Sequence, residues 1–213
     1  MAFYESINDG NNFVISFTQN PQQDFGIFAK GYTQAASSLA EHLLGRPHFS
    51  DYEAYPVVFL YRQAFELYLK GLYYRAGLIS FFNGSPGVDC KSIHKHWLIP
   101  LAETFKQVCH IIFPLNGKLR QLSEKVLHYA TEFEQIDKDS FGYRYPIDTK
   151  GNSSTEHNQV VNLLALHNSM KELLGELEIV DLGLDVEASE AQKIYEILQD
   201  AENIMASKNG ETD

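Results

Sequence analysis

The sequence contains few of the motifs that identify a particular chemistry. Cys90 and Cys109 are the two cysteines in 213 residues, too few for a disulfide framework and without the paired spacing of a structural zinc site. A glycine-rich phosphate loop, a GxSxG elbow, and HExxH and CxxC motifs are all missing. We therefore expect reduced thiols and no cofactor.

Long apolar runs and excess positive charge are also missing. The run from Val57 ends at Arg62, far short of the roughly 20 apolar residues that span a bilayer. Residues 1–10 have neither the basic start nor the apolar core of a signal peptide. The net charge of −11 argues against a broad electrostatic surface for nucleic acid, although a local basic patch can still bind it. These features predict a cytoplasmic protein with no membrane contact.

Helical periodicity is what the sequence has instead. Apolar residues recur at steps of three and four residues, which predicts an all-α, up-and-down bundle of five to six helices packed at shallow angles. The expected organisation is an N-terminal arm at 1–24, with at most one short strand at 11–17, a bundle at 25–178, a C-terminal helix at 179–206 and a disordered tail at 207–213. We expect a break between the fifth and sixth helices at 181–185.

The segment 55–77 is apolar on almost every side and is expected to form the central helix. Arg62, Glu66 and Lys70 follow one another at four-residue steps, so they share one helical face. We name these three residues the ionic stripe. It is either a solvated set of helix-stabilising pairs, or a cleft in which Arg62 and Lys70 hold a phosphate and Glu66 orients them.

A long loop without periodicity at 137–154 offers a second candidate surface. Within it Tyr143 and Tyr145 flank Arg144, and tyrosine rings can stack on bases while arginine binds phosphate. The alternative is that the tyrosines plug the open end of the bundle and Arg144 pairs with Asp137 or Asp139.

Two histidines, His94 and His96, precede the third expected helix. No cysteine or carboxylate follows them at ligand spacing, so we expect no metal site there. A role at the surface or at the start of the helix is favoured.

Two of these segments together resemble a known family. FELYLKGLYYRAG at 65–77, a variable loop, and HKHWLIPL at 94–101 are similar to the HEPN superfamily of all-α bundles. The matching residues are Glu66, Lys70, Gly77, and His94 or His96 with Leu98. The resemblance covers residues 25–178. It implies a homodimer in a bacterial toxin–antitoxin or anti-phage system, and many such proteins are metal-independent ribonucleases.

The usual ribonuclease site of that family is Arg-x4-His, assembled from two subunits. None of the eight histidines here has an arginine five residues before it, and Lys91 before His96 is the only basic match. Lysine replaces a bidentate arginine poorly, so the site cannot be transferred to this chain. The candidate catalytic residues are instead His94, His96 and Arg144, with Arg62 as a further candidate.

The leading hypothesis is a nucleic-acid-binding or protein-interaction module of such a system. RNA, a nucleotide or a partner protein of the same system would be the ligand. The binding residues would be the ionic stripe and the loop, namely Arg62, Glu66, Lys70, Tyr143, Arg144 and Tyr145. The alternatives are a ribonuclease with a divergent site and a non-catalytic scaffold. Convergence of Arg62, a histidine and Arg144 in one cleft would favour the leading hypothesis or the ribonuclease over the scaffold.

Overall fold

The computed structural model describes residues 24–85, 96–137, 142–144, 150–154 and 160–209, and within them five helices. The prediction of an all-α bundle is confirmed. Residues 1–23 of the N-terminal arm, with the strand expected among them, lie outside the described residues, and Asp24 is the N-cap residue at the start of α1. The helices are α1 (Phe25–Leu44), α2 (Asp51–Phe82), α3 (Leu98–Ile112), α4 (Gly117–Ile136) and α5 (Leu163–Asn209).

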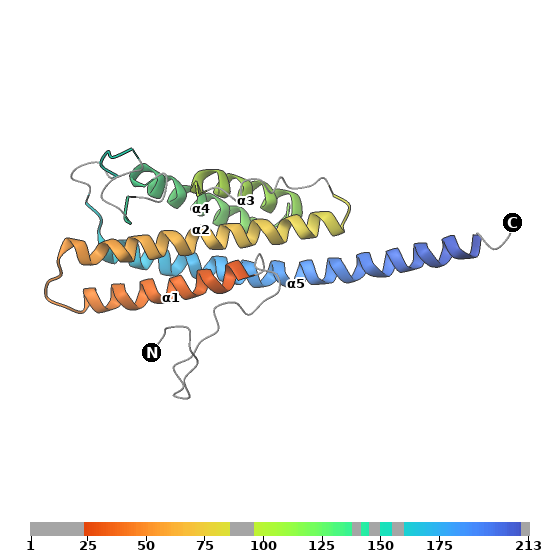
Figure 1. Cartoon of the computed structure of the whole chain (residues 1–213), viewed down its shortest axis with the longest axis horizontal. Helices are drawn as coiled ribbons and strands as arrows, with labels where there is room; N and C mark the ends of the chain where they lie inside the picture. The colour runs from red at the N-terminus through yellow and green to blue at the C-terminus, as the bar shows by residue number, and fades with distance from the viewer. Residues whose placement is uncertain (1–23, 86–95, 138–141, 145–149, 155–159, 210–213) are drawn as a thin grey trace, which may run out of the picture.

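The central helix α2 lies between two helix pairs (Figure 1). It packs against α1 and α5 on one side and against α3 on the other, with α4 packed on α3. Its Tyr61, Phe65 and Leu69 are fully buried, as expected of a helix that is apolar on nearly all faces. The helix begins with a capping box, in which the backbone N–H of Ser50 donates to Glu53 Oε2 at 2.7 Å.

The predicted break at 181–185 is wrong, because α5 runs without interruption for 47 residues. Asp181 and Asp185 do not end the helix, since both carboxylates bind Arg75 of α2, at 2.8 and 3.0 Å. Residues 179–206 are therefore part of α5 and not a separate helix. The helix also includes residues 207–209, which were expected in the tail. The C-terminal part of α5 extends past the ends of the other helices (Figure 1).

The Arg75–Asp181 pair lies where α1, α2 and α5 approach closely, and a glycine makes that approach possible. Burial raises the pKa of Asp181 to about 6, although Arg75 favours its ionised form. A Cβ atom at Gly26 of α1 would overlap Asp181 Oδ2. Gly31, one and a half turns further along α1, has no atom within 4 Å of the corresponding position.

We expect Gly26→Ala to lower the free energy of unfolding by ~1–3 kcal/mol, because the added methyl group displaces a carboxylate held by Arg75. The matched control Gly31→Ala lies on the same helix and should raise it by up to ~1 kcal/mol through helix propensity. Urea unfolding followed by circular dichroism at 222 nm measures both. Equal stability of the two variants would contradict the close contact.

No helix among the described residues is both long and apolar enough to cross a bilayer.

Candidate functional site

The ionic stripe lies inside the molecule. Arg62, Glu66 and Lys70 are 0%, 1% and 6% exposed. The predicted pairing at four-residue spacing is present, but it is in the interior and not on a solvated face. The stripe faces His96, which precedes α3, and Asp137, which follows α4.

Five side chains form one connected cluster around the stripe, which we name the Glu66 cluster: Arg62, Glu66, Lys70, His96 and Asp137. Glu66 Oε1 accepts hydrogen bonds from Lys70 Nζ and His96 Nδ1, both at 2.8 Å. Glu66 Oε2 accepts one from Arg62 Nη1 at 3.1 Å. Arg62 Nη2 donates to the backbone carbonyl of His96 at 2.9 Å, and its Nε lies 3.7 Å from Asp137 Oδ2.

The charges of the Glu66 cluster balance. Two cations, Arg62 and Lys70, face two carboxylates, Glu66 and Asp137. Burial opposes ionisation of Glu66, but hydrogen bonds from Lys70 and His96 and the charge of Arg62 outweigh it and hold its pKa below the ordinary value. A balanced, hydrogen-bonded group of charges can be buried at acceptable cost, whereas removing one member leaves an uncompensated charge.

His96 is the member of the cluster that reaches the surface. Its side chain is 62% exposed, while its Nδ1 is tied to a carboxylate that is almost completely buried. An ionised carboxylate only accepts hydrogen bonds, so in neutral His96 the proton is on Nδ1. The other ring nitrogen, Nε2, is then a base on an exposed ring, as in catalytic carboxylate–histidine pairs.

The turn 142–144 is attached to the same cluster. The backbone N–H of Gly142 donates to Asp137 Oδ1 at 2.9 Å. The Arg144 guanidinium lies over the ring of Phe59, 5.6 Å from its centroid, and Phe59 is less than one turn before Arg62 on α2. His96 and Arg144 therefore both contact α2, His96 at Glu66 and Arg144 at Phe59, seven residues apart.

Tyr143 lies half-buried against the core. Burial, with the charge of Asp137, raises the pKa of its phenol to about 12. Its ring offers less area for stacking than an exposed tyrosine would, which fits the alternative in which the loop tyrosines close the end of the bundle.

Some of the predicted site residues are buried, some are exposed, and some lie outside the described residues. Arg62 does not reach the surface, so its predicted contact with a phosphate does not fit its position. Glu66 and Lys70 are buried behind His96, which is exposed, as is Arg144. His94 and Tyr145 lie outside the described residues.

Two residues near His96 were not among the predicted site residues. Asp137 closes the cluster at the end of α4, and nothing in its local sequence predicts contact with Arg62. Trp97 is next to His96 and 39% exposed. Its position beside a candidate histidine, as the single tryptophan of the chain, could have drawn attention to it.

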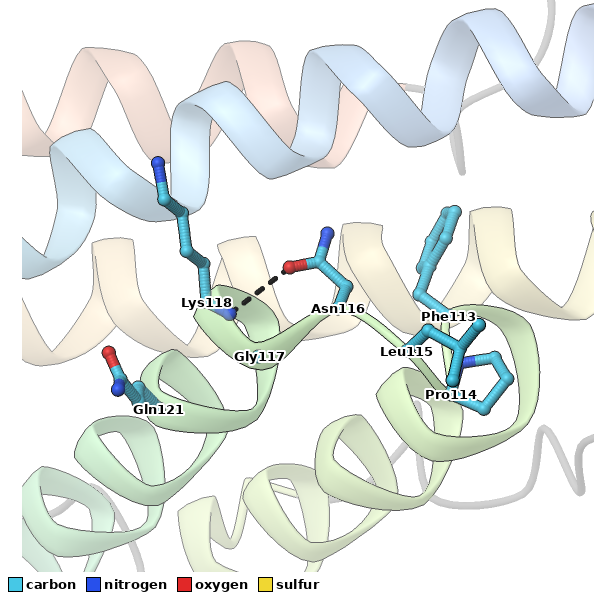
Figure 2. Close-up of a pocket in the computed structure, with 7 residues that line it drawn as sticks. All are labelled: Phe113, Pro114, Leu115, Asn116, Gly117, Lys118 and Gln121. Atoms are coloured by element: carbon cyan, nitrogen blue, oxygen red, sulfur yellow. Dashed lines mark hydrogen bonds between the residues drawn. The ribbon is translucent and has the colours of Figure 1, made fainter.

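The two larger hollows on the described surface are lined by residues other than His96 and Arg144. A hollow of about 730 Å³ lies at the α3–α4 turn between Phe113 and Gln121. Figure 2 shows its residues, with Asn116 capping α4 by accepting a hydrogen bond from the N–H of Lys118 at 3.1 Å. A groove of about 490 Å³ between α4 and the start of α5 includes Tyr143. Neither contains His96 or Arg144.

Among the described residues, no three or more histidine, cysteine, aspartate or glutamate side chains are grouped as metal ligands. Comparisons of the chain with protein-family models, curated protein sequences and solved structures found no match.

We expect Glu66→Gln to lower the free energy of unfolding at pH 7 by ~3 kcal/mol or more, because Arg62 and Lys70 would lose their shared carboxylate. The pKa of Glu66 is lowered in the folded state, so its contribution is present above the ordinary value of 4.5 and is lost as the pH falls through the lower, folded value. The difference between wild type and variant should therefore shrink on acidification below about 4.5.

Chemical denaturation at pH 7 and at several acidic pH values tests this expectation. Glu187→Gln is the control, because Glu187 is an exposed glutamate of α5. This substitution should leave the free energy of unfolding unchanged at every pH. A difference for Glu66→Gln that grows on acidification would contradict the assignment.

Proposed function

We propose that this chain is a HEPN-like domain protein of a bacterial defence or toxin–antitoxin system. It binds RNA at the surface around His96 and Arg144, acts in the cytoplasm and forms a homodimer. The observation that supports RNA binding is the placement of exposed His96 and Arg144 on one buried, charge-balanced cluster that fixes both segments against α2.

The surface provides the two contacts that single-stranded RNA needs. Arg144 is exposed and its guanidinium is positioned on Phe59, where it can bind a phosphate. Trp97 is partly exposed beside His96, and an aromatic ring of this kind stacks on a base. A local site built from these two residues does not require a basic protein, which suits a chain of net charge −11.

A second candidate function, metal-independent RNA cleavage, is supported by the Glu66–His96 pair. His96 Nε2 would remove the proton of a ribose 2′-OH, and the resulting oxygen would attack the adjacent phosphorus. The bond from phosphorus to the 5′-oxygen then breaks, and that oxygen takes a proton from solvent, leaving a 2′,3′-cyclic phosphate and a 5′-OH. Because Arg62 is buried, Arg144 would stabilise the charge on the phosphate.

RNA binding can be measured by fluorescence anisotropy with a labelled single-stranded RNA in EDTA. Arg144→Ala and Trp97→Ala should each weaken binding about tenfold, a loss of ~1.4 kcal/mol for one phosphate contact or one stacked base. The matched control His110→Ala removes an exposed histidine of α3 and should leave affinity unchanged. Failure of the wild type to bind, or equal weakening by the control, would reject the surface and leave the scaffold interpretation.

RNA cleavage is a separate test, made with labelled total RNA and no added metal. If the second candidate holds, the wild type produces 2′,3′-cyclic phosphate ends, and His96→Ala and the double variant His94→Ala/His96→Ala lose about 100-fold or more in rate. His110→Ala should cleave normally. Intact RNA at high wild-type concentration would reject cleavage, while RNA binding would still be decided by the anisotropy measurement.

A further inference from the structure

The face of α5 that points away from the bundle carries a regular row of side chains. We name it the outer stripe; its eight positions are Ile179, Leu182, Val186, Glu190, Lys193, Ile197, Ala201 and Ile204. Its five large apolar members are 56–72% exposed. Single exposed apolar side chains are ordinary, but several of them along one face of a helix mark an interaction surface.

The opposite face of α5 is the one that packs on the bundle. Leu184, Ala188 and Ala191 are buried there, and the ring of Tyr195 lies 5.9 and 5.6 Å from those of Phe81 and Phe82. At 100° per residue, the outer stripe lies on the far side of the helix from these residues. A second helix can therefore lie along it without meeting the bundle.

The spacing of the outer stripe is the same in both directions. The successive steps are 3, 4, 4, 3, 4, 4 and 3 residues. An 11-residue repeat over three turns follows a nearly straight line along a helix. A palindromic row of this kind matches itself when a second copy is turned end to end.

The chemistry of the outer stripe has the same symmetry. In an antiparallel pair centred between Ala191 and Gln192, Glu190 of one copy lies opposite Lys193 of the other, and the reverse pair forms by symmetry. Further out, apolar residues face apolar residues. The facing pairs are Val186 with Ile197, Leu182 with Ala201, and Ile179 with Ile204.

We infer that the outer stripe is the dimer interface of this protein, with two α5 helices packed antiparallel about a two-fold axis. The contact is isologous, since each copy contributes the same surface. It covers about 38 Å of helix at 1.5 Å per residue, and it keeps the two bundles on opposite sides. This inference gives an interface to the homodimer proposed above and does not depend on RNA binding.

Size-exclusion chromatography with light scattering over a range of concentrations tests the interface. Wild type should be a dimer, and Val186→Asp and Ile197→Asp should each be monomeric, because each places two carboxylates in the apolar contact. Ile111→Asp is the control: Ile111 is 60% exposed on α3, and its replacement should leave the dimer intact.

Charge reversal tests the register. Glu190→Lys alone and Lys193→Glu alone each place like charges opposite one another and should raise the dissociation constant about tenfold or more. The double variant Glu190→Lys/Lys193→Glu restores opposite charges and should recover the wild-type dissociation constant. Failure of the double variant to recover would overturn the antiparallel pairing.

A cysteine pair tests the direction of the helices. In a background with Cys90→Ser and Cys109→Ala, oxidation of Val186→Cys/Ile197→Cys should give a covalent dimer, because these positions face each other between copies. Within one chain they are about 16 Å apart along the helix, beyond disulfide reach. Either single cysteine variant should stay uncoupled.

The remaining outcomes all count against the interface. A wild type that is monomeric at every concentration would overturn it, whether residues 1–23 of the same chain or a different protein covers the outer stripe. A dimer unaffected by Val186→Asp and Ile197→Asp would keep the homodimer but reject this surface. RNA binding would be untouched in either case, so the two proposals fail separately.

Discussion

The carboxylate of Glu66 is the interaction on which the arrangement around α2 depends. It is almost completely buried and accepts hydrogen bonds from Arg62, Lys70 and His96. Through His96 it holds the start of α3, and through Arg62 it reaches the end of α4 at Asp137. A misplaced helix would leave one of these charges without a partner in the interior, so the cluster favours one packing over others. Apolar contacts alone discriminate between packings less sharply.

A second buried ion pair has the corresponding role on the other side of α2. Arg75 binds Asp181 and Asp185 and fixes how far α5 lies along the bundle. The Glu66 cluster and the ion pairs of Arg75 lie 13 residues apart on one helix, counted from Arg62 to Arg75. One connects α2 to α3 and α4, and the other connects it to α5. The long central helix thus sets the register of the whole bundle.

The sequence predicted the helices better than it predicted their environment. The presence of α2, α3 and α4 follows from apolar periodicity, which is a local property, but α2 runs from Asp51 to Phe82 and so passes both ends of the expected segment 55–77. The burial of Arg62, Glu66 and Lys70 could not be predicted this way, because a four-residue spacing looks the same inside or outside a bundle. The partner His96 is 30 residues from Glu66. Likewise, the acidic residues at 181–185 look like a helix break in the local sequence. The partner that accommodates them in the helix, Arg75, lies 106 residues before Asp181.

The 3.7 Å separation between Arg62 Nε and Asp137 Oδ2 makes some links within the Glu66 cluster weaker than others. Within the described residues neither atom makes a hydrogen bond, so this link is weaker than the 2.8 Å contacts of Glu66 with Lys70 and His96. Local opening begins where the interactions are weakest. The link from α2 to the end of α4 is therefore the weaker part of the cluster, while two short contacts keep Glu66 bonded to Lys70 and His96. The cluster therefore has a tightly bonded half, at Glu66, Lys70 and His96, and a more loosely bonded half, at Asp137 and the turn that Asp137 holds.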